Sequence, residues 1–223
     1  MRAMGVSRIA APARFLALGD SYTIGEGVQP SASWPARLAR RLRAAGVAIE
    51  DPVVIARTGW ACDEILAALR SALRAGDLAP PWDLVTLLAG VNDQYRGRPA
   101  SRWRGDFAVL LEEALRLAAD RADRLVVLSV PDWGASPFAH DRDRAAIAAE
   151  IAALNREQRR LALATGATWL DIAGPASEGL AVDDAFATDG LHPSMRAYAA
   201  WVERLLRAVR PILVGGSSRV RTP

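Results

Sequence analysis

The chain has 223 residues, of which 51% are hydrophobic and 24% charged, as is typical of one globular domain with a sizeable core. The formal net charge is only +3, and the 28 basic residues, all arginines, are spread along the chain, which does not favour a nucleic-acid-binding surface. No window holds the roughly 18 uninterrupted apolar residues of a membrane-spanning helix. We therefore expect no nucleic-acid partner and no stable membrane insertion.

The N-terminal stretch and the single cysteine bear on the cellular compartment. Arg8 and Arg14 interrupt the apolar residues at the start of the chain, so the sequence does not indicate a signal peptide. Cys62 is the single cysteine and forms no internal disulfide, so nothing requires an oxidising compartment. We expect a cytoplasmic protein, with secretion or a periplasmic location left open. The sequence does not indicate the oligomeric state.

Short apolar runs alternate along the chain with longer amphipathic stretches, which is the pattern of repeated βαβ units. The runs predicted to be strands are 14–19, 52–56, 83–90, 124–130 and 167–172. Helices are predicted at 33–46, 62–76, 105–122, 142–166 and 194–210. We expect Pro211 to end the last helix, because proline lacks the backbone N–H that a helix interior requires.

This alternation predicts an α/β fold, specifically a three-layer α/β/α sandwich around a five-stranded parallel sheet. The flavodoxin-like strand order 2-1-3-4-5 is our prediction for the sheet. We expect residues 1–13 to form an N-terminal extension, 14–214 a single domain, and 215–223 a disordered tail.

Chemically specific residues follow the predicted strands. Ser21 comes after the first strand, Gly59 after the second and Asn92 after the third, and the loop 185–194 precedes the last helix. Open parallel sheets bind ligands outside the carboxyl ends of their strands, where the winding direction switches. We therefore expect these segments to converge at one edge of the sheet.

Asp189 and His192 are close enough in sequence for one loop to present a carboxylate to an imidazole. A serine hydroxyl is a poor nucleophile until a base takes its proton, and a carboxylate can hold an imidazole in the tautomer that does so. Ser21 could then attack a carbonyl, with the Asn92 amide and backbone N–H groups stabilising the oxyanion. Taken singly, each motif is weak, because a lone serine is often a helix cap and Asp-x-x-His is more often structural.

Four separated segments resemble blocks I, II, III and V of the SGNH hydrolases, also called GDSL esterases or lipases. They are "GDSYTIGEG" at 19–27, "ARTGWACDE" at 56–64, "AGVNDQY" at 89–95 and "DGLHPS" at 189–194. Each block is only moderately specific, but four in the right order make a strong joint signal. The resemblance spans residues 14 to about 211 and implies an SGNH hydrolase domain over 14–214.

Carried over residue by residue, the resemblance implies roles for five residues. Ser21 would be the nucleophile and would also contribute its backbone N–H to the oxyanion hole. Gly59 would supply a second backbone N–H and Asn92 a side-chain donor. His192 would be the base, with Asp189 as its orienting partner.

The sequence departs from the family pattern at two places. Tyr22 replaces the leucine that gives the GDSL motif its name, and the asparagine often found a few residues before the block II glycine is absent, which makes Gly59 the least secure assignment. Asp20 and Asp93 are interpreted as bracing their loops by accepting backbone N–H groups rather than taking part in the chemistry.

The implied activity is that of a serine esterase acting through an acyl-enzyme on short or medium acyl esters, with a small-molecule ester as partner and no metal or cofactor. The candidate substrate contacts are Tyr22, Trp60, Tyr95 and Trp133. Within the family, a carbohydrate O-deacetylase or a lysophospholipase stays open. Outside it, the alternatives are a flavodoxin-like binder of anions or flavin using 19–27, and a non-catalytic interaction module.

Overall fold

The protein, seen here as a computed structural model, is described over residues 11–172 and 180–216. In this part of the chain five parallel strands form one sheet in the order β2-β1-β3-β4-β5. The strands are β1 (Phe15–Gly19), β2 (Val53–Ala56), β3 (Leu84–Leu88), β4 (Leu125–Leu128) and β5 (Thr168–Leu170). Both the predicted strands and the predicted order are confirmed.

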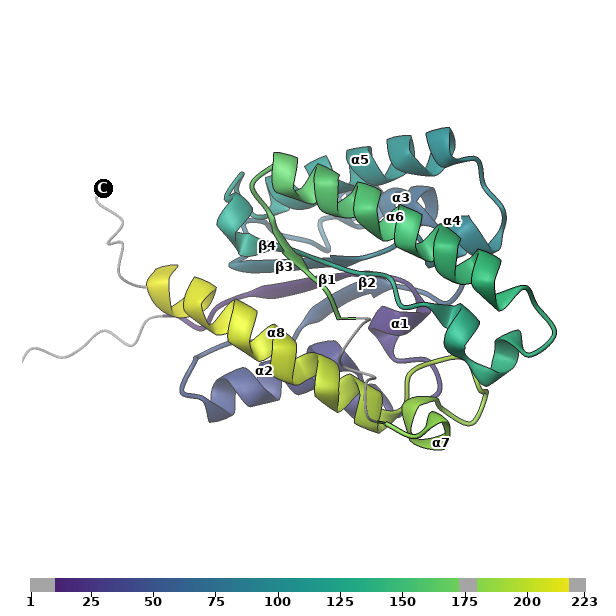
Figure 1. The fold of residues 1–223 in the computed structure, drawn as a ribbon. Coiled ribbons are helices and arrows are strands. Elements are labelled where there is room, and N and C mark those ends of the chain that lie inside the picture. Colours follow the sequence, from purple (N-terminus) through teal and green to yellow (C-terminus); the bar gives the residue numbers. More distant parts are fainter. Residues whose placement is uncertain (1–10, 173–179, 217–223) are drawn as a thin grey trace, which may run out of the picture.

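Helices cover both faces of the sheet (Figure 1). One face carries α2 (Trp34–Ala44) and α8 (Met195–Gly216), and the other carries α3 (Cys62–Ala75), α5 (Ala100–Leu117) and α6 (Arg144–Ala164). Short helical segments lie in the loops: α1 (Ser21–Ile24), η1 (Pro30–Ala32), α4 (Val91–Tyr95), η2 (Ala122–Arg124), η3 (Trp133–Ala135), η4 (Pro137–Ala139) and α7 (Val182–Ala185). The predicted three-layer sandwich is confirmed.

The core lies between the sheet and its helices. Every residue of β1, β3 and β4 is buried, as expected for parallel strands covered on both faces. On α2, Trp34, Leu38 and Leu42 are spaced four apart and are fully buried, so they form the face that packs on the sheet. Within the described residues no helix is both long and apolar enough to cross a membrane.

Helix α5 begins five residues before the predicted start and ends at Leu117 rather than at residue 122. The predicted helix began at Gly105, and a glycine inside a helix is destabilising. In the structure Gly105 faces open space, while Trp103 and Phe107 are buried four residues apart. Burial of these two aromatic rings therefore extends the helix through the glycine.

The prediction that Pro211 ends the last helix is wrong, since α8 continues to Gly216. Val209 and Leu213 lie on either side of the proline and are both buried in the core. The proline removes one backbone donor, and packing of this apolar face maintains the helix. The predicted tail therefore begins two residues too early, and its remainder, 217–223, lies outside the described residues.

The predicted N-terminal extension also ends too late. The Ala13 N–H donates to the Ala48 carbonyl at 2.8 Å, and the Glu50 N–H donates to the Ala13 carbonyl at 2.9 Å. These bonds form an isolated parallel bridge between Ala13 and Ile49, so Ala13 belongs to the folded body. Residues 1–10 of the predicted extension lie outside the described residues.

Candidate active site

Ser21 lies at the carboxyl edge of the sheet, where β1 turns directly into α1. The Asp20 side chain caps this helix by accepting the Tyr22 N–H at 3.0 Å. The turn is tight, because a Cβ on Gly19 would lie 2.1 Å from Thr23 Oγ1. Ser21 is the first residue of the helix, where backbone N–H groups have no partner within the helix.

Asp189 and His192 contact each other in the loop before α8. His192 Nδ1 lies 2.6 Å from Asp189 Oδ2, and Asp189 Oδ1 accepts the N–H groups of Leu191 and His192 at 2.9 and 3.0 Å. Partial burial opposes ionisation of Asp189, but these hydrogen bonds outweigh it and lower its pKa. An ionised carboxylate only accepts hydrogen bonds, so Nδ1 carries the proton and Nε2 can act as a base.

The turn at Ser21 and the loop of His192 pack against each other. The Tyr22 ring meets the His192 ring edge-on, with centroids 5.7 Å apart, and Tyr198 Oη donates to the Tyr22 carbonyl at 3.1 Å. Within the described residues no hydrogen bond joins the Ser21 hydroxyl to the His192 ring. Catalytic hydrogen bonds often tighten only when substrate binds. The packing of the two loops is therefore compatible with Ser21 as nucleophile and His192 as its base, although no hydrogen bond joins them in the described part of the chain.

Asn92 and Gly59 are also brought together, from the segments that follow β3 and β2. Asn92 belongs to α4, and its Nδ2 donates to the Trp60 carbonyl at 2.9 Å. Gly59 has a φ of 82° in a turn closed by a bond from the Trp60 N–H to the Arg57 carbonyl at 3.2 Å. This left-handed position favours glycine, which is the physical reason for that residue here.

Three polar contacts that the sequence did not predict fix the segment carrying Gly59. Arg96 donates to the Gly59 carbonyl and also binds Glu64 at 2.9 Å. The Thr58 hydroxyl donates to the Glu26 carboxylate, which lies in the loop after α1. These contacts join residues 32 or 37 positions apart, so no local motif signals them.

Two buried carboxylates support the loops of the site. Asp93 Oδ2 accepts the Cys62 N–H at 3.0 Å and its Oδ1 accepts from Arg98 at 3.1 Å. Because Asp20 binds a backbone N–H in the same way, the predicted bracing role of both aspartates is confirmed. Burial raises the pKa of Asp20 to about 7, with a smaller contribution from the nearby Asp93 carboxylate.

The raised pKa of Asp20 predicts how stability changes with pH. An aspartate with an unfolded-state pKa of 3.8 and a folded-state pKa of about 7 binds its proton more tightly when folded. The free energy of unfolding therefore falls as the pH rises between these two values, by at most about 4 kcal/mol. We expect Asp20→Asn to lose this contribution, because asparagine does not titrate while its Oδ1 can still accept a backbone N–H.

Urea unfolding of the wild type and Asp20→Asn at about pH 4 and pH 8 measures this difference. The Asp51→Asn variant is the control, because the Asp51 side chain is 86% exposed. The same pH slope in Asp20→Asn and the wild type would contradict the prediction.

An aromatic cluster lies beside these loops. The ring of Trp133 meets the ring of Tyr95 edge-on, with centroids 5.3 Å apart. It also packs at a tilt against the ring of Phe138, with centroids 6.3 Å apart. Its Nε1 donates to Gln94 Oε1 at 2.7 Å, and the Phe138 N–H donates to the Gly190 carbonyl at 3.0 Å. The cluster thus links the segments after β3 and β4 to the loop before α8. Gln94 was not identified from sequence, although it lies two residues after Asn92.

The four candidate substrate contacts differ in exposure. Tyr95 is 48% exposed and Trp60 is partly buried, whereas Tyr22 and Trp133 are only 3% and 5% exposed. Because the Tyr22 ring packs edge-on against His192, it supports the imidazole. Tyr95 and Trp60 therefore offer more surface to a ligand than Tyr22 and Trp133 do.

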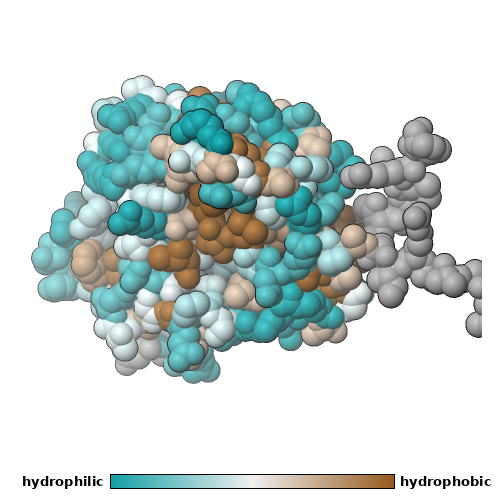
Figure 2. Space-filling view, turned by 180° about the vertical axis from the view of Figure 1, so that it is seen from behind, coloured by the Kyte–Doolittle hydropathy of each residue, from teal (hydrophilic) through white to brown (hydrophobic). Residues whose placement is uncertain are grey.

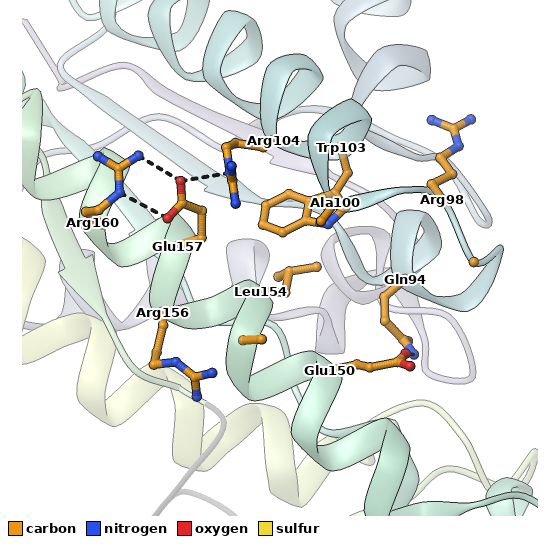
Figure 3. A pocket seen from close by; sticks show the side chains of 12 residues that line it. Gln94, Arg98, Ala100, Trp103, Arg104, Glu150, Leu154, Arg156, Glu157 and Arg160 are labelled. Atoms are coloured by element: carbon orange, nitrogen blue, oxygen red, sulfur yellow. Dashed lines mark hydrogen bonds and ion pairs between the residues drawn. The ribbon is translucent and has the colours of Figure 1, made fainter.

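A separate groove of about 570 Å³ opens between α5 and α6 (Figure 3). Trp103 and Leu154 contribute apolar surface to it, and two arginines converge on Glu157. Gln94 reaches its wall and binds Glu150 at 2.7 Å. None of the five predicted catalytic and oxyanion-hole residues lines this groove.

The groups gathered at the carboxyl edge suit acyl transfer by a serine side chain. They combine a hydroxyl, an imidazole held by an ionised carboxylate, and an amide donor beside a glycine turn. In residues 11–172 and 180–216, no three histidine, cysteine or acidic side chains form a group able to hold a metal ion. The fold, with these groups at its carboxyl edge, points to a hydrolase built on a flavodoxin-like sheet.

The chain belongs to the GDSL-like lipase/acylhydrolase family, whose sequence profile matches residues 17–200. The predicted SGNH/GDSL membership is confirmed, and with it the prediction of an enzyme that hydrolyses ester bonds. Comparison with curated protein sequences gives no significant match.

Solved structures share the fold over nearly the whole chain. The psychrotrophic esterase EstA from a Pseudoalteromonas species aligns with a TM-score of 0.65 and 16% identity, covering 91% of this chain and 99% of that one. TesA aligns with a TM-score of 0.65 and 23% identity, covering 90% of this chain and 99% of that one. Axe2, an acetyl xylan esterase from Geobacillus stearothermophilus, aligns with a TM-score of 0.65 and 17% identity, covering 95% of this chain and 98% of that one.

Proposed function

We propose that the protein is a serine esterase in which Ser21 attacks the carbonyl carbon of a carboxylic ester. The observation that carries this proposal is the 2.6 Å contact between His192 Nδ1 and Asp189 Oδ2, beside the turn that presents Ser21. His192 is the general base through Nε2, and Asp189 orients the ring and stabilises the imidazolium that forms. The strand-to-helix turn holds the serine at the edge where these groups meet.

The reaction has two halves. In acylation, Ser21 Oγ bonds to the carbonyl carbon while its proton passes to His192 Nε2. The bond to the leaving alcohol then breaks, and His192 returns the proton to that alcohol. In deacylation, water gives a proton to His192 as its oxygen bonds to the acyl carbon. The bond between that carbon and Ser21 Oγ then breaks, and His192 returns the proton to Oγ, which releases the acid and restores the Ser21 hydroxyl. The scheme requires no metal or cofactor.

The proposed oxyanion hole consists of the N–H groups of Ser21 and Gly59 and the side-chain amide of Asn92. The Asn92 amide has two hydrogens, and its bond to the Trp60 carbonyl uses only one, which leaves the other for a substrate oxygen. Within the described part of the chain, the Gly59 N–H has no hydrogen-bond acceptor. Arg96 fixes the Gly59 carbonyl and thereby supports the position of this turn.

We expect Asn92→Ala to lower kcat by about a hundred- to a thousandfold, because one oxyanion donor is lost. The variant also loses the bond to the Trp60 carbonyl, which costs about 1 kcal/mol of stability. Steady-state kinetics on p-nitrophenyl acetate and a thermal melt separate the two effects. Asn155→Ala is the control, because this amide binds the Val130 carbonyl at 2.8 Å outside the proposed oxyanion hole. Unchanged kcat in folded Asn92→Ala would show that the oxyanion hole is wrongly assigned.

The proposed substrates are short or medium acyl esters. The segment from β2 to α3 spans only residues 57–61, and β1 runs directly into α1, so neither connection carries a long lid insertion. Tyr95 and Trp60 are proposed to contact the acyl group, with Trp133 buttressing Tyr95 and Tyr22 supporting His192. The names of two structural neighbours, an esterase and an acetyl xylan esterase, are consistent with small acyl groups.

A substrate series tests this assignment. We expect kcat/KM to be highest for p-nitrophenyl esters of short or medium chain length and lower for long chains. Acetylated xylan and a lysophospholipid belong in the same series, because a clear preference for either would identify an O-deacetylase or a lysophospholipase instead.

Family membership disfavours a flavin binder and a non-catalytic module. A yellow protein without esterase activity would reverse that judgement.

A further inference from the structure

Strand β2 forms one edge of the sheet, and within the described residues no strand pairs with its outer side. Its four residues, Val-Val-Ile-Ala, carry no charge, and Val53 and Val54 are 37% and 38% exposed. An edge strand presents unpaired N–H and C=O groups, and native proteins commonly protect such edges with charges, prolines or bulges. Here Pro52 precedes the strand but leaves its four residues able to pair.

Apolar side chains gather on the surface around this edge. Figure 2 shows a hydrophobic patch in the middle of the face seen from behind Figure 1, with hydrophilic side chains around it. A groove of about 760 Å³ runs beside β2, lined by Val54 and Ala56 together with residues of α1, η1 and α2, and Arg40, Arg43 and Asp51 add charged groups to its lining. Exposed apolar surface with a polar border is typical of a protein interaction site.

The charges at the two ends of the strand indicate what pairs with it. Glu50 and Asp51 precede the apolar run and Arg57 follows it, and all three are exposed. Within the described residues Arg57 takes part in no ion pair. A second strand of the same sequence would bring the acidic end next to the arginine if it ran antiparallel, and like charges together if it ran parallel. The segment is therefore self-complementary in one direction only.

We infer that the protein forms a homodimer in which β2 pairs antiparallel with β2 of a second copy. The two-fold axis that relates two such strands is perpendicular to the sheet, so one residue faces itself. With Val54 on the axis, Val53 lies opposite Ile55, and Asp51 lies opposite Arg57 of the second copy. One Asp51 oxygen binds Arg43 at 2.8 Å, and the side chain remains 86% exposed, so it can also meet that arginine.

Sedimentation velocity over a wide range of protein concentration tests the dimer. We expect a concentration-dependent equilibrium between monomer and dimer, and Val54→Arg should weaken association at least about tenfold by placing two charges on the axis. Val109→Arg is the matched control, because Val109 is also a valine, is also 38% exposed, and lies on α5. A wild type that stays monomeric up to about 0.5 mM, or equal effects of the two variants, would overturn the inference.

Cross-linking tests the register independently. In Val54→Cys two thiols would face each other across the axis, and residues opposite each other in antiparallel strands lie about 4.5–5.5 Å apart between Cα atoms, close enough for a disulfide. The native Cys62 is buried and does not compete. We expect copper–phenanthroline to convert Val54→Cys to a covalent dimer while Val109→Cys stays monomeric. Equal cross-linking of both would contradict this register. These readouts do not depend on esterase activity.

Discussion

Replacing Ser21 by alanine is expected to lower kcat for p-nitrophenyl acetate by about 10⁴- to 10⁶-fold, because no other group in the proposed site can form the acyl-enzyme. The residual rate comes from the oxyanion donors and from substrate binding, so KM should change much less than kcat. Ser21 is 6% exposed and its hydroxyl has no hydrogen-bond partner among the described residues, so its removal should leave the fold intact.

Ser33→Ala is the matched control for this experiment. Ser33 is also 6% exposed, and its hydroxyl donates to the Pro30 carbonyl at 2.9 Å at the junction of η1 and α2. We expect this variant to lose some stability and to keep its activity. Comparable kcat losses in Ser21→Ala and Ser33→Ala would mean that general destabilisation, and not loss of the nucleophile, explains the result.

Replacing His192 by alanine is expected to lower kcat as severely, by about 10⁴- to 10⁶-fold, because the proton of Ser21 then has no acceptor. The matched control is His140→Ala, since His140 is the other histidine and is exposed beyond η4. Removing the His192 ring leaves space beside Tyr22, so added imidazole should restore part of the activity of His192→Ala. Full activity of His192→Ala without imidazole would exclude His192 as the base.

The layered fold could be predicted from sequence because its signals are local. Runs such as 125–128 are apolar throughout, as is typical of buried parallel strands, and the spacing of Trp34, Leu38 and Leu42 marks a helix face. The errors arose where tertiary packing outweighs local preference. Burial of Leu213 carries α8 past Pro211, and burial of Trp103 carries α5 across Gly105.

In the candidate site, too, the sequence predicted some features and missed others. Ser21, Asn92 and Gly59 each follow a strand, and parallel strands bring such positions to one edge without further information. Asp20 and Asp93 could be identified as supports of the site, but the side-chain contacts that join segments distant in sequence could not be predicted. Arg96 reaches the Gly59 carbonyl across 37 residues, and Trp133 reaches Gln94 across 39. Their side chains carry no local pattern that specifies these partners.

The central claim is that the Ser21 hydroxyl is the nucleophile, and labelling with a fluorophosphonate followed by peptide mapping tests it most directly. A fluorophosphonate loses fluoride when an activated serine hydroxyl attacks its phosphorus, so the adduct marks the nucleophile. The tryptic peptide 15–37 also contains Ser31 and Ser33, so fragmentation must locate the adduct. We predict one adduct per chain, on Ser21, with parallel loss of esterase activity. An active protein labelled at another serine, or inactivated without labelling at Ser21, would contradict the account.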